Sequence, residues 1–178
     1  NDNVFTKSIT VADDPKRIRG LRSMAFDAEG LECEKLTLVS EGQLNCWLLD
    51  SATGKQLEMP SNGRAARGIG SPPSPSASNI YIETGSVSLK ELMQQIGEGL
   101  YVTELIGMGV NGVTGDYSRG AAGYWIENGE LAYPVSEITI AGNLKNMFKH
   151  ITPADDLSFR YSINAPTLLV EEMTLAGL

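Results

Sequence analysis

The sequence predicts a mainly β, α+β fold: an antiparallel β-barrel or sandwich that carries two short helices. Glycine accounts for 19 of the 178 residues, which favours turns and strands over long helices. Apolar residues alternate with polar ones in several short segments, as half-buried strands require. Two-residue turn signals at Glu41-Gly42 and Asn128-Gly129 join neighbouring segments, and such turns connect antiparallel strands.

The first half of the chain is expected to contain three strands. Residues 1–30 are polar and are expected to be irregular. The apolar segments that follow form a hairpin around Glu41-Gly42 and then one further strand, namely Leu31–Val39, Leu44–Leu49 and Asn79–Thr84. Residues 51–78 are rich in glycine, proline and serine, so we expect a long loop there. A loop of that length in a compact domain is usually functional.

Two short helices are expected. Ser88 and Glu91 have the spacing of a reciprocal capping box, and Gly97 is suited to end the helix that they begin. Its apolar face consists of Leu89, Leu92, Met93 and Ile96. Asn143 can cap a second helix. The apolar residues of that helix are Leu144, Met147 and Phe148.

The second half of the chain is predicted to be rich in strands. Tyr124–Glu127 and Glu130–Tyr133 flank Asn128-Gly129, the pair favoured in a type I′ turn. Pro134 indicates an edge position or a bulge, because proline cannot donate to the hydrogen-bond ladder. The other predicted strands of this half are Leu100–Ile106, Val135–Ile140, Leu157–Tyr161 and Thr167–Leu175.

The stretch from Gly107 to Gly123 is the candidate binding site. Its glycines free the backbone for positive φ angles and for close approach to another chain. It connects a predicted strand to a firm hairpin, and binding loops are commonly held in that way. The alternative is a long connector without function. The candidate contacts with a partner or a peptide are Asn111, Asp116, Tyr117, Ser118, Arg119 and Gly120.

Composition and charge narrow the classes of partner. A hydrophobic share of 42% over 178 residues suits one domain with a sizeable core. The 22 acidic residues outnumber 14 basic ones, giving a net charge of −8, so we expect no nucleic acid and no membrane among its partners. The one basic cluster, which we expect to be solvated, comprises Lys16, Arg17, Arg19 and Arg22.

The two cysteines are predicted to be free thiols. If Glu41-Gly42 is the hairpin turn, Cys46 faces Thr37, and Cys33 lies four residues further along the strand. That offset corresponds to roughly 13 Å at about 3.3 Å per residue. A disulfide needs Cα atoms within about 7 Å. Free thiols suit a reducing cytosol.

No catalytic or metal-binding residue is predicted in this chain. Residues 107–112 match a dinucleotide-binding glycine pattern, but the residues after them are poor helix formers, and that fingerprint needs a helix to begin at once. Ser118 lacks the Gly-x-Ser-x-Gly spacing of a nucleophile elbow. The single histidine, His150, and two distant cysteines do not supply the three protein ligands of a catalytic zinc site.

Two long segments closely resemble the TldD/PmbA family. They are NGVTGDYSRGAAGYWIENGE at residues 111–130 and YPVSEITIAGNL at residues 133–144. Shorter matching stretches are WLLD at 47–50 and SNIY at 78–81. The match is to the PmbA (TldE) branch and covers nearly the whole chain. It implies that residues 1–178 form the single C-terminal domain of a longer PmbA-type protein, whose N-terminal domain is absent here.

The resemblance implies a cytoplasmic bacterial peptidase assembly of two kinds of subunit. The TldD-type catalytic subunit carries the zinc, and the PmbA-type subunit pairs with it. In the TldD type, the ligands are a His-Glu-x-x-x-His helix and a cysteine just before the hairpin. Aligned on Tyr124–Asn128, that cysteine position falls at Gly120. The resemblance therefore implies a chain that is inactive alone, without a cofactor of its own, and a peptide or unfolded protein as substrate.

Three hypotheses follow from these observations. The first is a non-catalytic subunit of a zinc metallopeptidase that acts in proteolysis and in the maturation of peptide antibiotics. The second is a stand-alone regulator that binds another protein, for example DNA gyrase. The third is an independent enzyme, against which the missing ligands argue. The sequence does not separate the first two.

Overall fold

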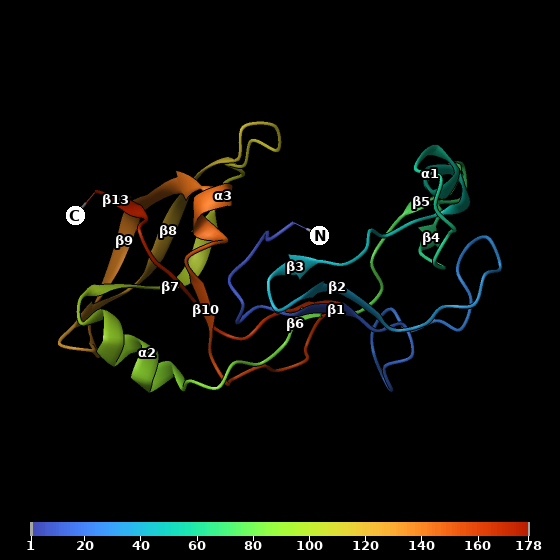
Figure 1. Cartoon of the computed structure of the whole chain (residues 1–178). Coiled ribbons are helices and arrows are strands. Elements are labelled where there is room, and N and C mark those ends of the chain that lie inside the picture. Colours follow the sequence, from blue (N-terminus) through green and yellow to red (C-terminus); the bar gives the residue numbers. More distant parts are fainter. Residues whose placement is uncertain (1, 178) are drawn as a thin grey trace.

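The computed structural model describes residues 2–177 and shows an elongated molecule built from several small sheets (Figure 1). A five-stranded sheet lies in the middle, a four-stranded sheet with two helices lies at one end, and a third helix lies at the other end. The expected sheet-rich α+β class is confirmed. Within the described residues no sheet closes into a barrel, because the strands are distributed over separate open sheets.

The five-stranded sheet brings together segments from both ends of the chain. Its order is β11-β6-β1-β2-β3, and all its neighbours are antiparallel except β11 and β6, which are parallel. The strands are β1 (Val11–Asp13), β2 (Leu36–Ser40), β3 (Gln43–Leu44), β6 (Ile80–Ile82) and β11 (Ile163–Asn164). Two further strands at the far end, β4 (Ala65–Ala66) and β5 (Ser74–Pro75), pair with each other.

The four-stranded sheet holds the candidate site, and its order is β13-β9-β8-β7. Its strands are β7 (Gly99–Ile106), β8 (Asp116–Glu127), β9 (Glu130–Asn143) and β13 (Thr174–Ala176). Ala121, Ile138 and Ile140 form a buried cluster on one face. Nearby, β10 (Ile151–Pro153) pairs with β12 (Leu168–Val170). The apolar face of the long β8–β9 hairpin is therefore the core of this end of the molecule.

Each of the three helices of the described chain has a side-chain cap at its N-terminus. In α2 (Leu89–Ile96), Ser88 and Glu91 form the predicted capping box, and Gly97 ends the helix at φ 66°. In α3 (Leu144–Met147), Asn143 accepts a hydrogen bond from the Lys145 amide, as predicted. The helix α1 (Ser51–Gln56) was not predicted; Asp50 and Thr53 cap it reciprocally.

Both predicted hairpin turns are confirmed by their backbone angles. Glu41 and Gly42 have φ angles of 48° and 79°, and Asn128 and Gly129 have 52° and 77°. Positive φ at both central residues is the mark of a type I′ turn. The second turn packs under α2, because the Gly129 amide donates to the Gly97 carbonyl at 2.9 Å. A Cβ atom on Gly129 would lie 2.7 Å from the Gln94 Cα.

Several predicted boundaries are wrong. The expected loop 51–78 contains α1, β4 and β5, and the irregular N-terminal segment contains β1. Strand β8 begins at Asp116, so the glycine-rich loop ends at residue 115 rather than 123. No strand covers Leu157–Tyr161. The predicted strand Thr167–Leu175 is divided into β12 and β13, which belong to different sheets.

A buried ion pair fixes the junction between β1 and the segment before β4. Arg64 and Asp13 are both fully buried, and the Arg64 Nε atom lies 2.5 Å from Asp13 Oδ2. The guanidinium also donates to the carbonyl oxygens of Gly63 and Glu34. The other carboxylate oxygen of Asp13 accepts from the amide and hydroxyl of Ser78. Each charge is thus surrounded by hydrogen-bond partners.

The two cysteines are free, as predicted. The Cys46 thiol lies 3.6 Å from the Thr37 carbonyl, in the expected register, and the fully buried Cys33 thiol lies 3.2 Å from the Gly63 carbonyl. Burial raises the pKa of both thiols, which reduces the thiolate fraction that reacts.

We therefore expect two thiols to react with Ellman's reagent in denaturant. In the native protein, Cys46 should react slowly and Cys33 should not react. Rapid native labelling of Cys33, identified by peptide mass spectrometry, would contradict this packing.

No helix within residues 2–177 has the length and apolar character needed to cross a membrane.

Candidate partner-binding loop

The glycine loop, which we define as residues 107–115, is an ordered extension between β7 and β8. It projects from the four-stranded sheet (Figure 1). Asn111 organises its turn: the side-chain Oδ1 accepts from the amides of Val113 and Thr114, and its backbone amide donates to the Asp116 carbonyl at 2.8 Å. This Asx-type turn is a local structure that asparagine forms readily.

A polar cluster at the base holds the loop to β9. The Asp116 carboxylate accepts from the Thr114 hydroxyl at 2.7 Å and from the Asn143 amide at 3.2 Å. The same Asn143 amide donates to the Thr114 carbonyl, while its oxygen caps α3. Gly109 lies so close to Ser118 that a Cβ atom would approach the Ser118 carbonyl to 1.5 Å. Glycine at 109 therefore permits the start of the loop to pass close to β8 at Ser118.

The carboxylate of Asp116 is stabilised in its charged form. Its pKa lies below the ordinary value of 3.8, first because of the Thr114 hydroxyl and then because of the Asn143 amide. A carboxylate with a lowered native-state pKa stabilises the fold above the unfolded-state pKa, and this contribution is lost as the pH falls through the native-state value.

We therefore expect the loop base to loosen only at a pH below 3.8. The side-chain amide signals of Asn143 in two-dimensional NMR spectra should then shift toward random-coil positions. Asp116→Asn should abolish that transition, and Asp155→Asn, at an exposed aspartate elsewhere, should leave it unchanged. A transition that survives in Asp116→Asn would show that another group causes it.

The tip of the glycine loop is apolar and exposed. Met108 and Val113 are 101% and 90% exposed, and Val110 at 55% lies between them in the sequence. Ile106, at the end of β7, is also 55% exposed. Several exposed apolar side chains on one structured projection are typical of a surface that another protein covers.

The six predicted contact residues have different positions. Asn111 and Asp116 shape the loop, and the Ser118 side chain is exposed. Tyr117 packs against the buried cluster of the sheet. Arg119 donates from Nη2 to the Leu105 carbonyl at 3.2 Å, and its buried Nε has no hydrogen-bond partner in the part of the chain that the structure describes. Gly120 is paired with both neighbouring strands. The six residues therefore lie at one end of the sheet, and several of them support the backbone rather than face solvent.

Sequence reasoning missed the apolar tip. Met108 and Val113 stand between glycines, and no periodicity marks them as exposed. The signal that could have found them was the presence of two large apolar residues where glycine-rich loops usually carry polar ones.

An apolar hollow of about 730 Å³ lies on the core side of the same sheet. Its lining residues come from α2, the four-stranded sheet and β12. Its lining includes Leu92, Met93, Ile96, Leu100, Leu168 and Leu175. Tyr117 is the only one of the six predicted residues that lines it.

Within residues 2–177, the site offers no nucleophile paired with a base and no set of zinc ligands. His150 Nδ1 lies 3.0 Å from the Asn146 carbonyl, and both cysteines belong to the other sheet region. Among residues 2–177, no three histidine, cysteine or acidic side chains gather to hold a metal. Gly120 stands at the position where the resemblance places the cysteine of the TldD-type subunit. A Cβ atom on Gly120 would lie 3.4 Å from the Ile106 Cβ. The donors present among these described residues do not fit zinc.

Comparison with known proteins identifies the family. Residues 1–177 match the PmbA/TldA metallopeptidase C-terminal domain. The chain is 44% identical over 170 residues to the metalloprotease PmbA of Escherichia coli O157:H7, which covers 95% of this chain and 36% of that protein. A Haemophilus influenzae PmbA homologue is 41% identical over 170 residues, 94% of this chain and 36% of its own length. The chain belongs to the PmbA/TldD metallopeptidase family and corresponds to its C-terminal domain.

Two solved structures share the fold. A Thermotoga maritima MSB8 protein, described as a candidate modulator of a DNA gyrase, superimposes with a TM-score of 0.87 at 30% identity, covering 98% of this chain and 40% of that one. TldE from Thermococcus kodakarensis superimposes with a TM-score of 0.87 at 25% identity, and the match covers 99% of this chain and 41% of that one. The chain thus spans about 40% of the length of these relatives.

Proposed function

We propose that this domain belongs to a non-catalytic, TldE-type subunit of a cytoplasmic zinc metallopeptidase, in which it docks onto a TldD-type catalytic subunit. The complex cleaves peptides or unfolded proteins and acts in proteolysis and in peptide-antibiotic maturation. Zinc is held by the partner, and this chain contributes a binding surface.

The observation that carries the proposal is the exposed apolar tip of the glycine loop, whose backbone is held by hydrogen bonds. Met108 and Val113 expose nearly their whole side chains, although Asn111, Thr114 and Asp116 hold the backbone beneath them. A partner that covers this tip removes apolar surface from water without ordering a flexible segment, so little conformational entropy opposes binding.

The absence of a fitting donor set supports a division of labour between subunits. A catalytic zinc needs about three protein ligands and an open position for water. Residues 2–177 do not group such side chains, and in this proposal the partner subunit holds the zinc and its acidified water. The loop and the adjoining start of β8 would position that partner or the peptide.

Val113→Ser is expected to weaken docking to the TldD-type subunit of the same organism by about tenfold, because a large apolar contact is lost. The matched control is Ile69→Ser, which changes a fully exposed residue between β4 and β5. The measurement is complex formation by light scattering after size exclusion, together with chelator-sensitive cleavage of an unfolded substrate such as carboxymethylated α-lactalbumin.

A stable equimolar complex that is impaired by Val113→Ser and not by Ile69→Ser supports the proposal. Cleavage by the purified chain alone, with one zinc per chain by mass spectrometry, would overturn it.

The alternative is a stand-alone regulator that binds a protein such as DNA gyrase. The description of the Thermotoga maritima relative favours testing it. Binding of purified gyrase with a change in supercoiling activity, in the absence of any TldD-type subunit, would establish this alternative.

A further inference from the structure

A second exposed surface lies far from the glycine loop. We define the arginine loop as residues 16–23, between β1 and the segment that leads to β2; it projects from the five-stranded sheet at the lower right of Figure 1. Ile18 and Leu21 at its tip are 88% and 71% exposed. Arg17, Arg19 and Arg22 alternate with them in the sequence.

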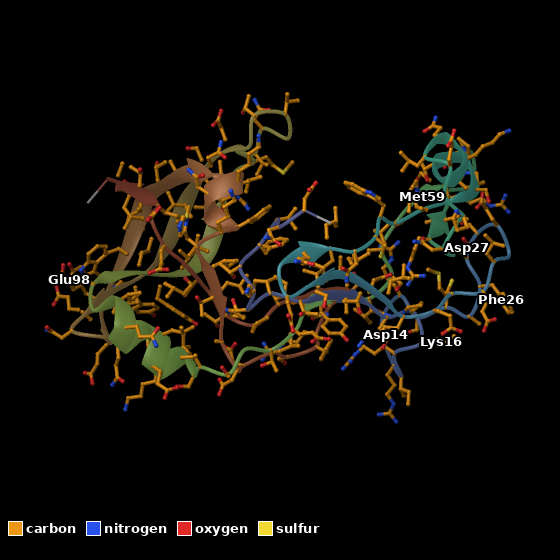
Figure 2. All side chains as sticks on the ribbon, viewed as in Figure 1. Asp14, Lys16, Phe26, Asp27, Met59 and Glu98 are labelled. Atoms are coloured by element: carbon orange, nitrogen blue, oxygen red, sulfur yellow. The ribbon has the colours of Figure 1, made fainter. Side chains whose placement is uncertain are left out.

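A buried asparagine holds the arginine loop in shape. Asn79 is 1% exposed; its Oδ1 accepts from the Arg22 amide at 3.0 Å, and its Nδ2 donates to the Asp14 carbonyl and the Ser23 hydroxyl. The Ser23 hydroxyl donates to the Arg17 carbonyl at 2.6 Å. Figure 2 shows Asp14 and Lys16 where the loop leaves the sheet. The exposed tip is therefore displayed on a fixed frame.

Arg19 adopts a backbone conformation that suits glycine better. Its φ angle is 58°, in the left-handed region, which is unfavourable for a residue with a long side chain. Its side chain is exposed, and it makes no hydrogen bond or ion pair within residues 2–177. The fold thus gains nothing visible from arginine here. A strained residue whose side chain has no internal role indicates an external one.

The three arginines leave the loop positively charged on an acidic protein. Lys16 is neutralised by Glu32 and Glu34. In the described chain, no carboxylate lies within ion-pairing distance of the three arginines. The Arg17 guanidinium stacks 3.2 Å from the centre of the Phe159 ring, which fixes its position. Charge complementarity and the two exposed apolar residues therefore favour an acidic partner with apolar side chains.

We infer that the arginine loop docks a short acidic segment of another polypeptide. Ile18 and Leu21 would contact its apolar side chains, and the arginines would pair with its carboxylates. The overall charge of −8 opposes approach to an extended anionic surface such as a membrane or a phosphate backbone, whereas a short acidic segment can contact the arginine loop alone. Two apolar residues and three cations in one loop offer contacts for a short peptide rather than for a large surface. The inference does not depend on the glycine loop, which lies on another sheet (Figure 1).

The test begins with random 12-residue peptides displayed on phage and selected on the immobilised 178-residue chain. Enriched peptides are synthesised, and their Kd is measured by fluorescence anisotropy. Arg19→Gly should weaken binding about tenfold, with an unchanged or higher melting temperature because the backbone strain is relieved. Ile18→Ser should weaken it similarly. Ile69→Ser, at a fully exposed residue between β4 and β5, is the matched control and should have no effect.

Enrichment of peptides that combine aspartate or glutamate with leucine, isoleucine or aromatic residues supports the inference. So does an affinity that falls as ionic strength rises from about 0.05 to about 0.5 M. Peptides without acidic residues, or binding unchanged in both loop variants, overturn it. Loop-dependent self-association, or loop-dependent binding to phosphatidylserine vesicles, assigns the surface to a different occupant and also overturns it.

Discussion

Arg64→Leu is expected to destabilise the protein by about 3–5 kcal/mol, since removing one partner leaves a buried and uncompensated charge. The Asp13 carboxylate would lose its ion pair at a site that is fully closed to solvent. The carbonyls of Gly63 and Glu34 would also lose their donors. Such a loss is a large fraction of the total stability of an ordinary domain, about 5–15 kcal/mol.

The measurement is equilibrium unfolding in guanidinium chloride. Arg67→Ala changes an exposed arginine three residues away and should remain within about 0.5 kcal/mol of the parent. Adding Asp13→Leu to Arg64→Leu should recover part of the loss, because the double variant buries no charge. A small effect of Arg64→Leu alone would mean that water reaches Asp13.

Gly123→Ala is expected to cost about 3 kcal/mol or more, through steric overlap between β7 and β8. A Cβ atom at position 123 would lie 1.9 Å from the Tyr101 carbonyl oxygen and 3.1 Å from the Val102 Cα. Both are backbone atoms, so no side chain can rotate away. The two strands would have to separate at the register shift between Val102 and Glu104.

Gly120→Ala provides a control in the same strand. Its Cβ atom would meet the Ile106 Cβ at 3.4 Å, an ordinary contact. Thermal unfolding followed by circular dichroism should show a large fall in Tm for Gly123→Ala and a small change for Gly120→Ala. Equal effects would indicate a general intolerance of β8 to side chains.

The features that local chemistry specifies were predictable from the sequence. The turn at Asn128-Gly129 and the capping box of Ser88 and Glu91 each depend on residues within four positions of one another. The family resemblance gave the domain type in the same way, from contiguous motifs.

The features that depend on tertiary pairing were not predictable. Strand β1 is three residues long and is stabilised by its hydrogen-bonded pairing with β2 on one side and β6 on the other. The first half of β8 looked like a loop because Gly120 and Gly123 have no β propensity, yet strand packing requires glycine at 123. The segment Leu157–Tyr161 was predicted to be a strand, but it pairs with no strand in the described chain. The Phe159 ring instead packs against Arg17 and Tyr81.

The turn at Asn128-Gly129 has a consequence for where this domain tolerates added sequence. Hairpin tips are the usual places for inserted tags, since they face solvent. Here the tip is pressed against α2, and the Gly129 amide is bonded to Gly97. Gly70, between β4 and β5, is exposed and has no atom within 4 Å of a potential Cβ. An epitope or fluorophore therefore belongs there, away from the proposed docking surface of the glycine loop, whereas lengthening the tight turn would displace a helix.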